Sequence, residues 1–176
     1  MSTSYRFCPA CGVALELRIE GERERDACPS CRWVHWDNPV PVVAAIIEYQ
    51  GKVLLARNAA WPPKRFALVT GFLERDESPR AAVEREVKEE TSLATRAATL
   101  VGLYDFARLN QLIIAYHVEA EGEIRLSEEL IEYRLIEPAK VKPWTQGTGP
   151  ALADWMRSRG LAVEFLPLPP LDARPA

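Results

Sequence analysis

Three glutamates near the middle of the chain have the spacing of a metal site. If the segment around them is helical, Glu86, Glu89 and Glu90 fall within about 100° of arc and share one face. Carboxylates this close repel one another unless a cation lies between them, and oxygen ligands that leave room for water and phosphate suit Mg²⁺ or Mn²⁺. Such a site can activate a water and neutralise the charge of a diphosphate.

The competing interpretation is that the run from Glu84 to Glu90 is a solvated helix face, as charge runs usually are. Two features favour a site. Arg85 and Lys88 can orient or screen particular carboxylates, and Gly71 ends a predicted strand directly before the helix. This arrangement would place loop backbone beside the acidic face.

All four cysteines stand in two CxxC pairs near the N-terminus, Cys8 with Cys11 and Cys28 with Cys31, and sixteen residues separate the pairs. Four thiolates satisfy a tetrahedral Zn²⁺, and each CxxC turn supplies two sulfurs. Two copies at this spacing do not resemble a thioredoxin-like redox site. Because four protein sulfurs close the coordination sphere, the zinc is expected to be structural.

The elements that must position these side chains follow from local patterns. Ser78-Pro79 offers an N-cap and a proline at the first helical position, which predicts a helix from Pro79 to about Thr91. A hairpin is expected over 42–49 and 52–57, turning at Gln50-Gly51. Further strands are predicted over 66–70, 97–106, 112–121 and 133–136, with a last helix opening at Thr148-Gly149-Pro150. This mixture indicates α+β or an α/β/α sandwich.

Composition limits the possible partners. The 176 residues are 48% hydrophobic and 27% charged with a net charge of −3, which suits one domain and a small appendage and offers no wide basic surface. No apolar run approaches the roughly 20 residues that span a bilayer, and the N-terminus lacks a signal-peptide core, so a cytoplasmic location without membrane partners is expected. Residues 20–26 hold four acidic side chains and two arginines, which favours packing or homodimerisation over nucleic-acid contact.

The stretch from Gly71 to Leu93 resembles the Nudix box: Gly, five residues, Glu, seven residues, Arg-Glu, an aliphatic, any residue, Glu-Glu, any residue, Gly and an aliphatic. The matching residues are Gly71, Glu77, Arg85, Glu86, Val87, Glu89, Glu90 and Leu93. Only Ser92 departs, at the final glycine, where positive φ would strain it. The resemblance extends from the cysteine segment to roughly Trp155.

This resemblance implies a Nudix-type α/β/α sandwich over residues 38–160, with a zinc ribbon over 1–37 and a Pro-rich tail over 161–176. Glu86, Glu89 and Glu90 would bind the catalytic Mg²⁺ or Mn²⁺, helped by the carbonyl of Gly71. Glu77 and Arg85 would stabilise the loop–helix–loop. The general base stays open among Glu86, Glu89 and Glu129, and Glu129 is otherwise a surface acid in an acidic loop.

A zinc ribbon joined to a Nudix domain is similar to NADH pyrophosphatases, which carry a Ser-Gln-Pro-Trp-Pro-Phe-Pro array after the box. Residues 108–113 keep only a glutamine of that array, so ADP-ribose or FAD is expected to be preferred over NADH. An adenine would need an aromatic platform, and the candidates, each with core packing as its alternative, are Phe72, Tyr104, Phe106 and Trp61. A non-catalytic nucleotide sensor and an enzyme that removes NAD caps from RNA are the alternative functions.

Overall fold

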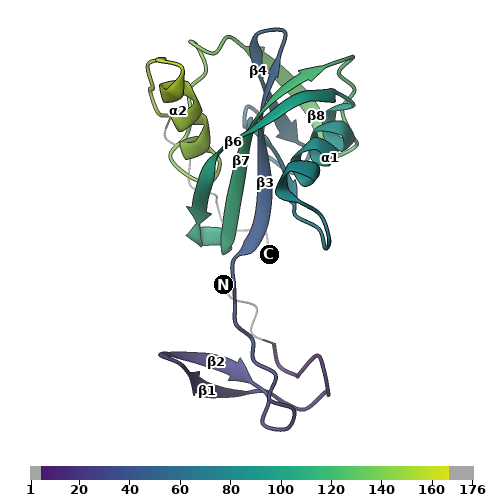
Figure 1. The fold of residues 1–176 in the computed structure, drawn as a ribbon, viewed down its shortest axis with the longest axis vertical. Helices are drawn as coiled ribbons and strands as arrows, with labels where there is room; N and C mark the ends of the chain where they lie inside the picture. The colour runs from purple at the N-terminus through teal and green to yellow at the C-terminus, as the bar shows by residue number, and fades with distance from the viewer. Residues whose placement is uncertain (1–4, 167–176) are drawn as a thin grey trace. The chain divides into compact units, whose positions relative to one another are not determined.

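The structure is a computed structural model that describes residues 5–166 of the 176-residue chain. It divides into two compact units, the first ending at Pro39 and the second beginning at Val40. In the first unit, β1 (Glu16–Glu20) and β2 (Arg23–Ala27) form an antiparallel hairpin between the two CxxC pairs (Figure 1). This hairpin was not predicted from the sequence: Leu17 and Ile19 alternate with charged residues along β1, but β2 has only charged residues before Ala27.

The second unit is built on a six-stranded mixed sheet. Its strands are β3 (Val40–Tyr49), β4 (Lys52–Asn58), β5 (Val69–Phe72), β6 (Ala94–Phe106), β7 (Gln111–Glu121) and β8 (Leu130–Ile136). The order is β6-β7-β3-β4-β8, and β5 pairs with β3 beside β4. Only the β3–β7 pair is parallel, and a short 3₁₀ turn, η1 (Ala107–Leu109), connects β6 to β7.

Two helices cover opposite faces of this sheet, α1 (Pro79–Thr91) and α2 (Gly149–Ser158) (Figure 1). Side chains alternate along β3, since successive residues of a strand point to opposite faces. Val43, Ala45 and Ile47 pack with the core that includes α1, whereas Ile46 packs with the core that includes α2. The predicted α/β/α sandwich is therefore confirmed.

The helix that carries the predicted metal ligands has the predicted bounds, Pro79–Thr91. The Ser78 hydroxyl caps its N-terminus by accepting the Ala81 N–H at 3.1 Å. Ser92 caps its C-terminus in the left-handed region, with φ 61°, and donates its N–H to the Lys88 carbonyl. A serine thus adopts the conformation for which the Nudix box uses glycine, and its hydroxyl donates to the Arg125 carbonyl at 3.1 Å.

The strand before this helix differs from the prediction. A strand over 66–70 ending at Gly71 was expected, but β5 spans Val69–Phe72 and pairs Gly71 with Val43 of β3. Ala67 instead exchanges two 2.9 Å backbone hydrogen bonds with Ala56 of β4. The chain therefore changes its partner strand between Ala67 and Val69, which a local apolar pattern does not reveal.

The predicted tail over 161–176 lies largely outside the described residues, which end at Leu166. The Leu166 N–H donates to the Pro143 carbonyl at 2.7 Å, and Leu161 packs against the core beside α2. Within residues 5–166, neither helix is long and apolar enough to cross a membrane.

Candidate functional site

One arginine of α1 joins the segments that surround the predicted metal ligands. Arg85 Nε and Nη2 donate to the two carboxylate oxygens of Glu77, at 2.9 and 3.1 Å. Its Nη1 donates to Glu86 Oε1 at 2.7 Å and to Glu89 Oε2 at 2.9 Å, and its Nη2 also donates to the Phe72 carbonyl at 3.1 Å. A planar guanidinium that makes these bonds fixes the loop before the helix, the end of β5 and two glutamates together.

The glutamates differ in their surroundings. The side chain of Glu86 is only 12% exposed, whereas that of Glu89 is 58% exposed. Burial raises the pKa of Glu86, and the negative charges of Glu89 and Glu90 raise it further. The hydrogen bond from Arg85 lowers this pKa, but burial outweighs it. Hydrogen bonds from Arg85 lower the pKa of Glu77. Glu77 is therefore held as a structural anion, and Glu86 lies where added positive charge would stabilise its ionised form.

The absence of a side chain at Gly71 leaves room for the carboxylate of Glu86. A Cβ at Gly71 would lie 1.8 Å from Glu86 Cδ and 1.9 Å from Glu86 Oε1, so a side chain at this position and the observed carboxylate position exclude each other. The glycine lets a carboxylate from α1 lie directly against the backbone of β5. The predicted pairing of Gly71 with the acidic face thus corresponds to a direct contact.

Ser127 connects the third glutamate to the loop of Glu129. The Ser127 hydroxyl donates to Glu90 Oε2 at 2.6 Å and accepts the Glu129 N–H at 3.2 Å. The Glu129 carbonyl in turn accepts the Ala59 N–H at 2.8 Å. These bonds hold the loop between the C-terminal turn of α1 and the loop that follows β4. Ser127 was not predicted as a site residue, because a serine in an acidic loop has no pattern that marks it as functional.

A cavity of about 610 Å³ adjoins these residues, which is a usual size for a small-molecule site. Its lining includes the predicted site residues Gly71, Phe72, Arg85, Glu86, Glu89, Glu90, Phe106 and Glu129. It also includes Trp61, Arg65, Gln111 and Trp144, which come from three different segments. Carboxylates and aromatic side chains thus share one cavity.

Tyr104 is the predicted site residue that the structure places elsewhere. It is not among the residues that line the cavity, and its hydroxyl donates to Asp154 Oδ2 of α2 at 3.0 Å. Its ring packs beside the small core cluster that includes Ala151 of α2. Tyr104 therefore packs in the core and is not placed to bind an adenine, whereas Phe72 and Phe106 line the cavity.

The oxygen atoms at the site are of the type that binds a hard divalent cation. Glu86, Glu89 and Glu90 line one cavity together with Gly71, and carboxylate and carbonyl oxygens are the ligands that Mg²⁺ and Mn²⁺ prefer. Their oxygens point to different partners, since Glu86 and Glu89 accept from Arg85 and Glu90 accepts from Ser127. Each of these bonds engages one carboxylate oxygen, and each carboxylate has a second oxygen that these bonds do not use.

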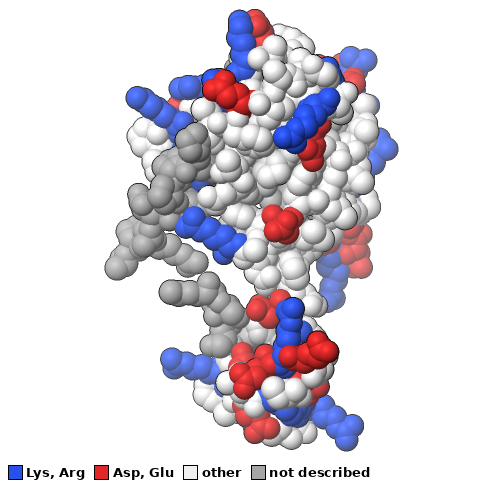
Figure 2. Space-filling model, turned by 90° about the vertical axis from the view of Figure 1, so that its left-hand side faces the viewer, with Lys and Arg blue, Asp and Glu red and all other residues white. Residues whose placement is uncertain are grey.

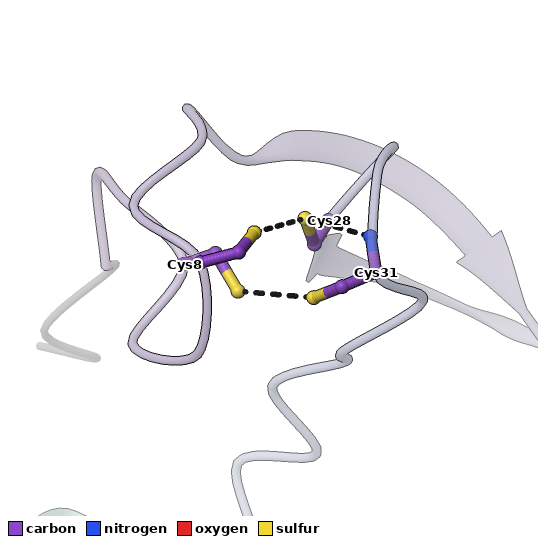
Figure 3. A group of neighbouring side chains, drawn as sticks. Cys8, Cys28 and Cys31 are labelled. Atoms are coloured by element: carbon purple, nitrogen blue, oxygen red, sulfur yellow. Dashed lines mark hydrogen bonds between the residues drawn. The ribbon is translucent and has the colours of Figure 1, made fainter.

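The four cysteines form a second, separate group (Figure 3). Their sulfurs all lie within 4.8 Å of one another, with Cys8 and Cys31 at 3.4 Å and Cys11 and Cys28 at 3.5 Å. Zinc–sulfur bonds of about 2.3 Å in a tetrahedron require sulfurs about 3.8 Å apart, so the group fits Zn²⁺. The Cys31 N–H donates to Cys28 Sγ at 3.4 Å, which is the main reason that the pKa of the Cys28 thiol is lowered to about 6.

Charges of both signs cover the ribbon. In Figure 2, Lys and Arg side chains alternate with Asp and Glu over the part of the ribbon that faces the viewer. The register of β1 with β2 places Glu20 opposite Arg23, and Arg25 lies over the ring of Trp36 at 5.0 Å. On this face of the ribbon, the mixture does not form the basic stripe that binds phosphate backbones.

We expect one tightly held zinc per chain, and we expect Cys28→Ser to unfold the ribbon without removing a residue from the cavity. Cys28 is fully buried, so the change removes a ligand from a closed site. Elemental analysis of protein purified without chelator measures the zinc, and limited proteolysis within residues 5–39 measures ribbon unfolding. Zinc-free protein with a protease-resistant ribbon would contradict the expectation.

Comparisons with known families agree with the two-unit division of the chain. Residues 37–155 match the family model described as the NUDIX domain, and residues 6–37 match the model of the zinc ribbon described as Nudix N-terminal. Among solved structures, the crystal structure of a NUDIX hydrolase from Nitrosomonas europaea covers 93% of this chain and 100% of its own, with 25% identity and a TM-score of 0.72. An ADP-ribose pyrophosphatase from Streptococcus suis shares the fold, with 20% identity, a TM-score of 0.58 and coverage of 73% and 99%.

Curated relatives show a more specific similarity. The chain is 30% identical over 131 residues to the NAD-capped RNA hydrolase NudC of Stutzerimonas stutzeri, covering 74% of this chain and 47% of that protein. It is 30% identical over 137 residues to the human NAD-capped RNA hydrolase NUDT12, covering 73% of this chain and 30% of that protein. The chain thus spans less than half the length of these relatives.

Proposed function

The chain belongs to the Nudix family, and from this premise we propose that it hydrolyses the diphosphate of a nucleoside diphosphate derivative to two monophosphates with Mg²⁺ or Mn²⁺. The observation that carries the proposal is the set of bonds made by Arg85, which holds Glu86 and Glu89 beside Gly71 on the wall of a cavity of substrate size. On a solvated helix face the glutamates would extend into water, whereas the side chain of Glu86 is only 12% exposed and lies against Gly71 of β5.

The reaction adds water across one phosphorus–oxygen bond. The water oxygen bonds to one phosphorus, the bridging oxygen leaves with the other phosphate, and a carboxylate accepts the proton. When bound, the divalent cation neutralises diphosphate charge and lowers the pKa of a water. Arg85 orients Glu86 and Glu89, Ser127 orients Glu90, and the base is Glu86, Glu89 or Glu129, all of which line the cavity.

We expect ADP-ribose or FAD to be a better substrate than NADH. Residues 108–113 lack the proline-aromatic array of NADH pyrophosphatases, and of that stretch Leu109 and Gln111 line the cavity. Residues 108–113 contain no aromatic side chain that could hold a reduced nicotinamide. The ratio of kcat/KM values measures the preference. A kcat/KM for NADH ten times that for both other substrates would contradict it.

Removal of the NAD cap from RNA is the second candidate, because the 30% identical relatives are named for that reaction. The mixed charge of the ribbon and the net charge of −3 argue against extended contact with an RNA chain.

One assay separates these functions. Purified protein with Mg²⁺ is given ADP-ribose, FAD, NADH and NAD-capped RNA, and the products are identified by chromatography. Two monophosphates from the small substrates support the proposal, and faster cleavage of capped RNA supports the second candidate. Binding of these nucleotides without any turnover would instead indicate a nucleotide-sensing module.

A further inference from the structure

Arg65 is a half-buried cation that has no anionic partner among the residues that the structure describes. Three arginines of the second unit are half-buried among its described residues, namely Arg57, Arg65 and Arg85. Arg57 pairs with Glu132 at 3.1 Å, and Arg85 pairs with three carboxylates. No ion pair or side-chain hydrogen bond joins Arg65 to any residue that the structure describes; its guanidinium lies over the ring of Trp61 at 5.3 Å.

Arg65 lies in the candidate site, where a substrate could supply the missing anion. Arg65 and Trp61 line the same cavity as Glu86, Glu89 and Glu90. Burial lowers the pKa of Arg65, and the positive charge of Arg108 acts in the same direction. A guanidinium removed from water without a counter-ion is destabilised, and an anion that enters the cavity relieves that cost.

The contact with the Trp61 ring also favours a particular kind of ligand. When the face of a guanidinium lies on an aromatic ring, its edge with the N–H donors stays free for hydrogen bonds. Paired N–H donors match the oxygens of phosphate, and less side-chain entropy is lost because the group is already held. No carboxylate that the structure describes accepts from these donors, although five glutamates line the same cavity.

We propose that Arg65, which lies over the Trp61 ring, binds the diphosphate of the substrate in this cavity. The choice of ligand rests on the proposed diphosphate hydrolysis, because the diphosphate is the anionic group that all substrates of that class share. Arg65 is then a binding residue with the same contact before and during the reaction. Its loss should raise KM more than it lowers kcat.

Calorimetric titration without metal tests the contact independently of turnover. The ligands are adenosine, ADP and adenosine 2′,5′-bisphosphate, and the variants are Arg65→Gln, Arg65→Lys and Lys64→Gln. Lys64 is exposed and does not line the cavity, so Lys64→Gln removes the same charge next to Arg65 without removing the contact.

We expect Arg65→Gln to weaken ADP binding at least about tenfold, as for loss of charge-assisted hydrogen bonds, and to leave adenosine binding unchanged. Arg65→Lys should recover part of the loss, and Lys64→Gln should match the parent protein. Unchanged ADP binding in Arg65→Gln, or a loss confined to the 2′,5′-bisphosphate, would overturn the assignment to the diphosphate.

The steady-state arm separates failure of this inference from failure of the proposed function. An active parent enzyme whose KM is unchanged by Arg65→Gln would overturn the role of Arg65 and leave the hydrolase proposal standing. An inactive parent protein that loses ADP affinity on Arg65→Gln would overturn the hydrolase proposal and retain the binding site. A melting curve confirms that each variant is folded.

Discussion

Glu89→Gln is expected to lower kcat at least about 100-fold while KM changes little. Glutamine keeps the shape of the side chain and removes a charge that would hold the cation and stabilise the developing phosphate charge. Glu89 is 58% exposed and accepts one hydrogen bond from Arg85, so its loss should not unfold the protein. Initial rates at saturating Mg²⁺, with a melting curve for each protein, measure the effect.

Glu84→Gln is the matched control for this change. Glu84 lies on the same helix, pairs with Arg80 at 3.0 Å and does not line the cavity. It should keep parental turnover. If Glu89→Gln is folded and turns over as fast as Glu84→Gln, the metal site is not on this face of α1.

Gly71→Ala is expected to lower kcat about 100-fold as well, but for a steric reason. The new Cβ would lie 1.8 Å from Glu86 Cδ, so the carboxylate must leave its place against β5. Because the displaced atoms are the end of a flexible side chain, the fold should survive, whereas misplacing a reacting group by about 1 Å can decrease the rate about 100-fold. We therefore expect a large loss of turnover with a melting temperature close to that of the parent protein.

Gly102→Ala gives the control for replacing a strand glycine. Gly102 lies on β6, where a Cβ would approach the Tyr104 hydroxyl at 3.0 Å, and it does not line the cavity. This variant should remain active. An active Gly71→Ala enzyme would show that Glu86 does not need to lie against β5 for turnover.

Local spacing was enough to predict the helix and the grouping of the cysteines. Ser78-Pro79 begins the helix at the predicted residue, because a side-chain cap and a fixed proline φ act within one turn. The cysteines meet because each CxxC turn presents two sulfurs. In both cases the physical preferences act between residues close in sequence.

Long-range contacts were less accessible to sequence reasoning. The wrong bounds of β5 arise because the chain leaves β4 at Ala67 and joins β3 at Val69, which depends on strand order. Tyr104 and Phe106 are both aromatic and stand two residues apart on β6, yet only Phe106 lines the cavity. Asp154 of α2 binds the Tyr104 hydroxyl, and no pattern within β6 could predict a partner fifty residues away.

The sequence alone therefore determined the family resemblance, the acidic face of α1 and the candidate zinc ligands, because these depend on residue type and near spacing. Tertiary structure alone decided that Glu86 is the glutamate of this face that lies against Gly71, and that Ser127 binds Glu90. It also decided that Arg65 has no anionic partner among the described residues. The physical reason is that such contacts form between segments brought together by strand pairing and helix packing. A side chain's type limits what it can bind, and the fold decides which partners it meets.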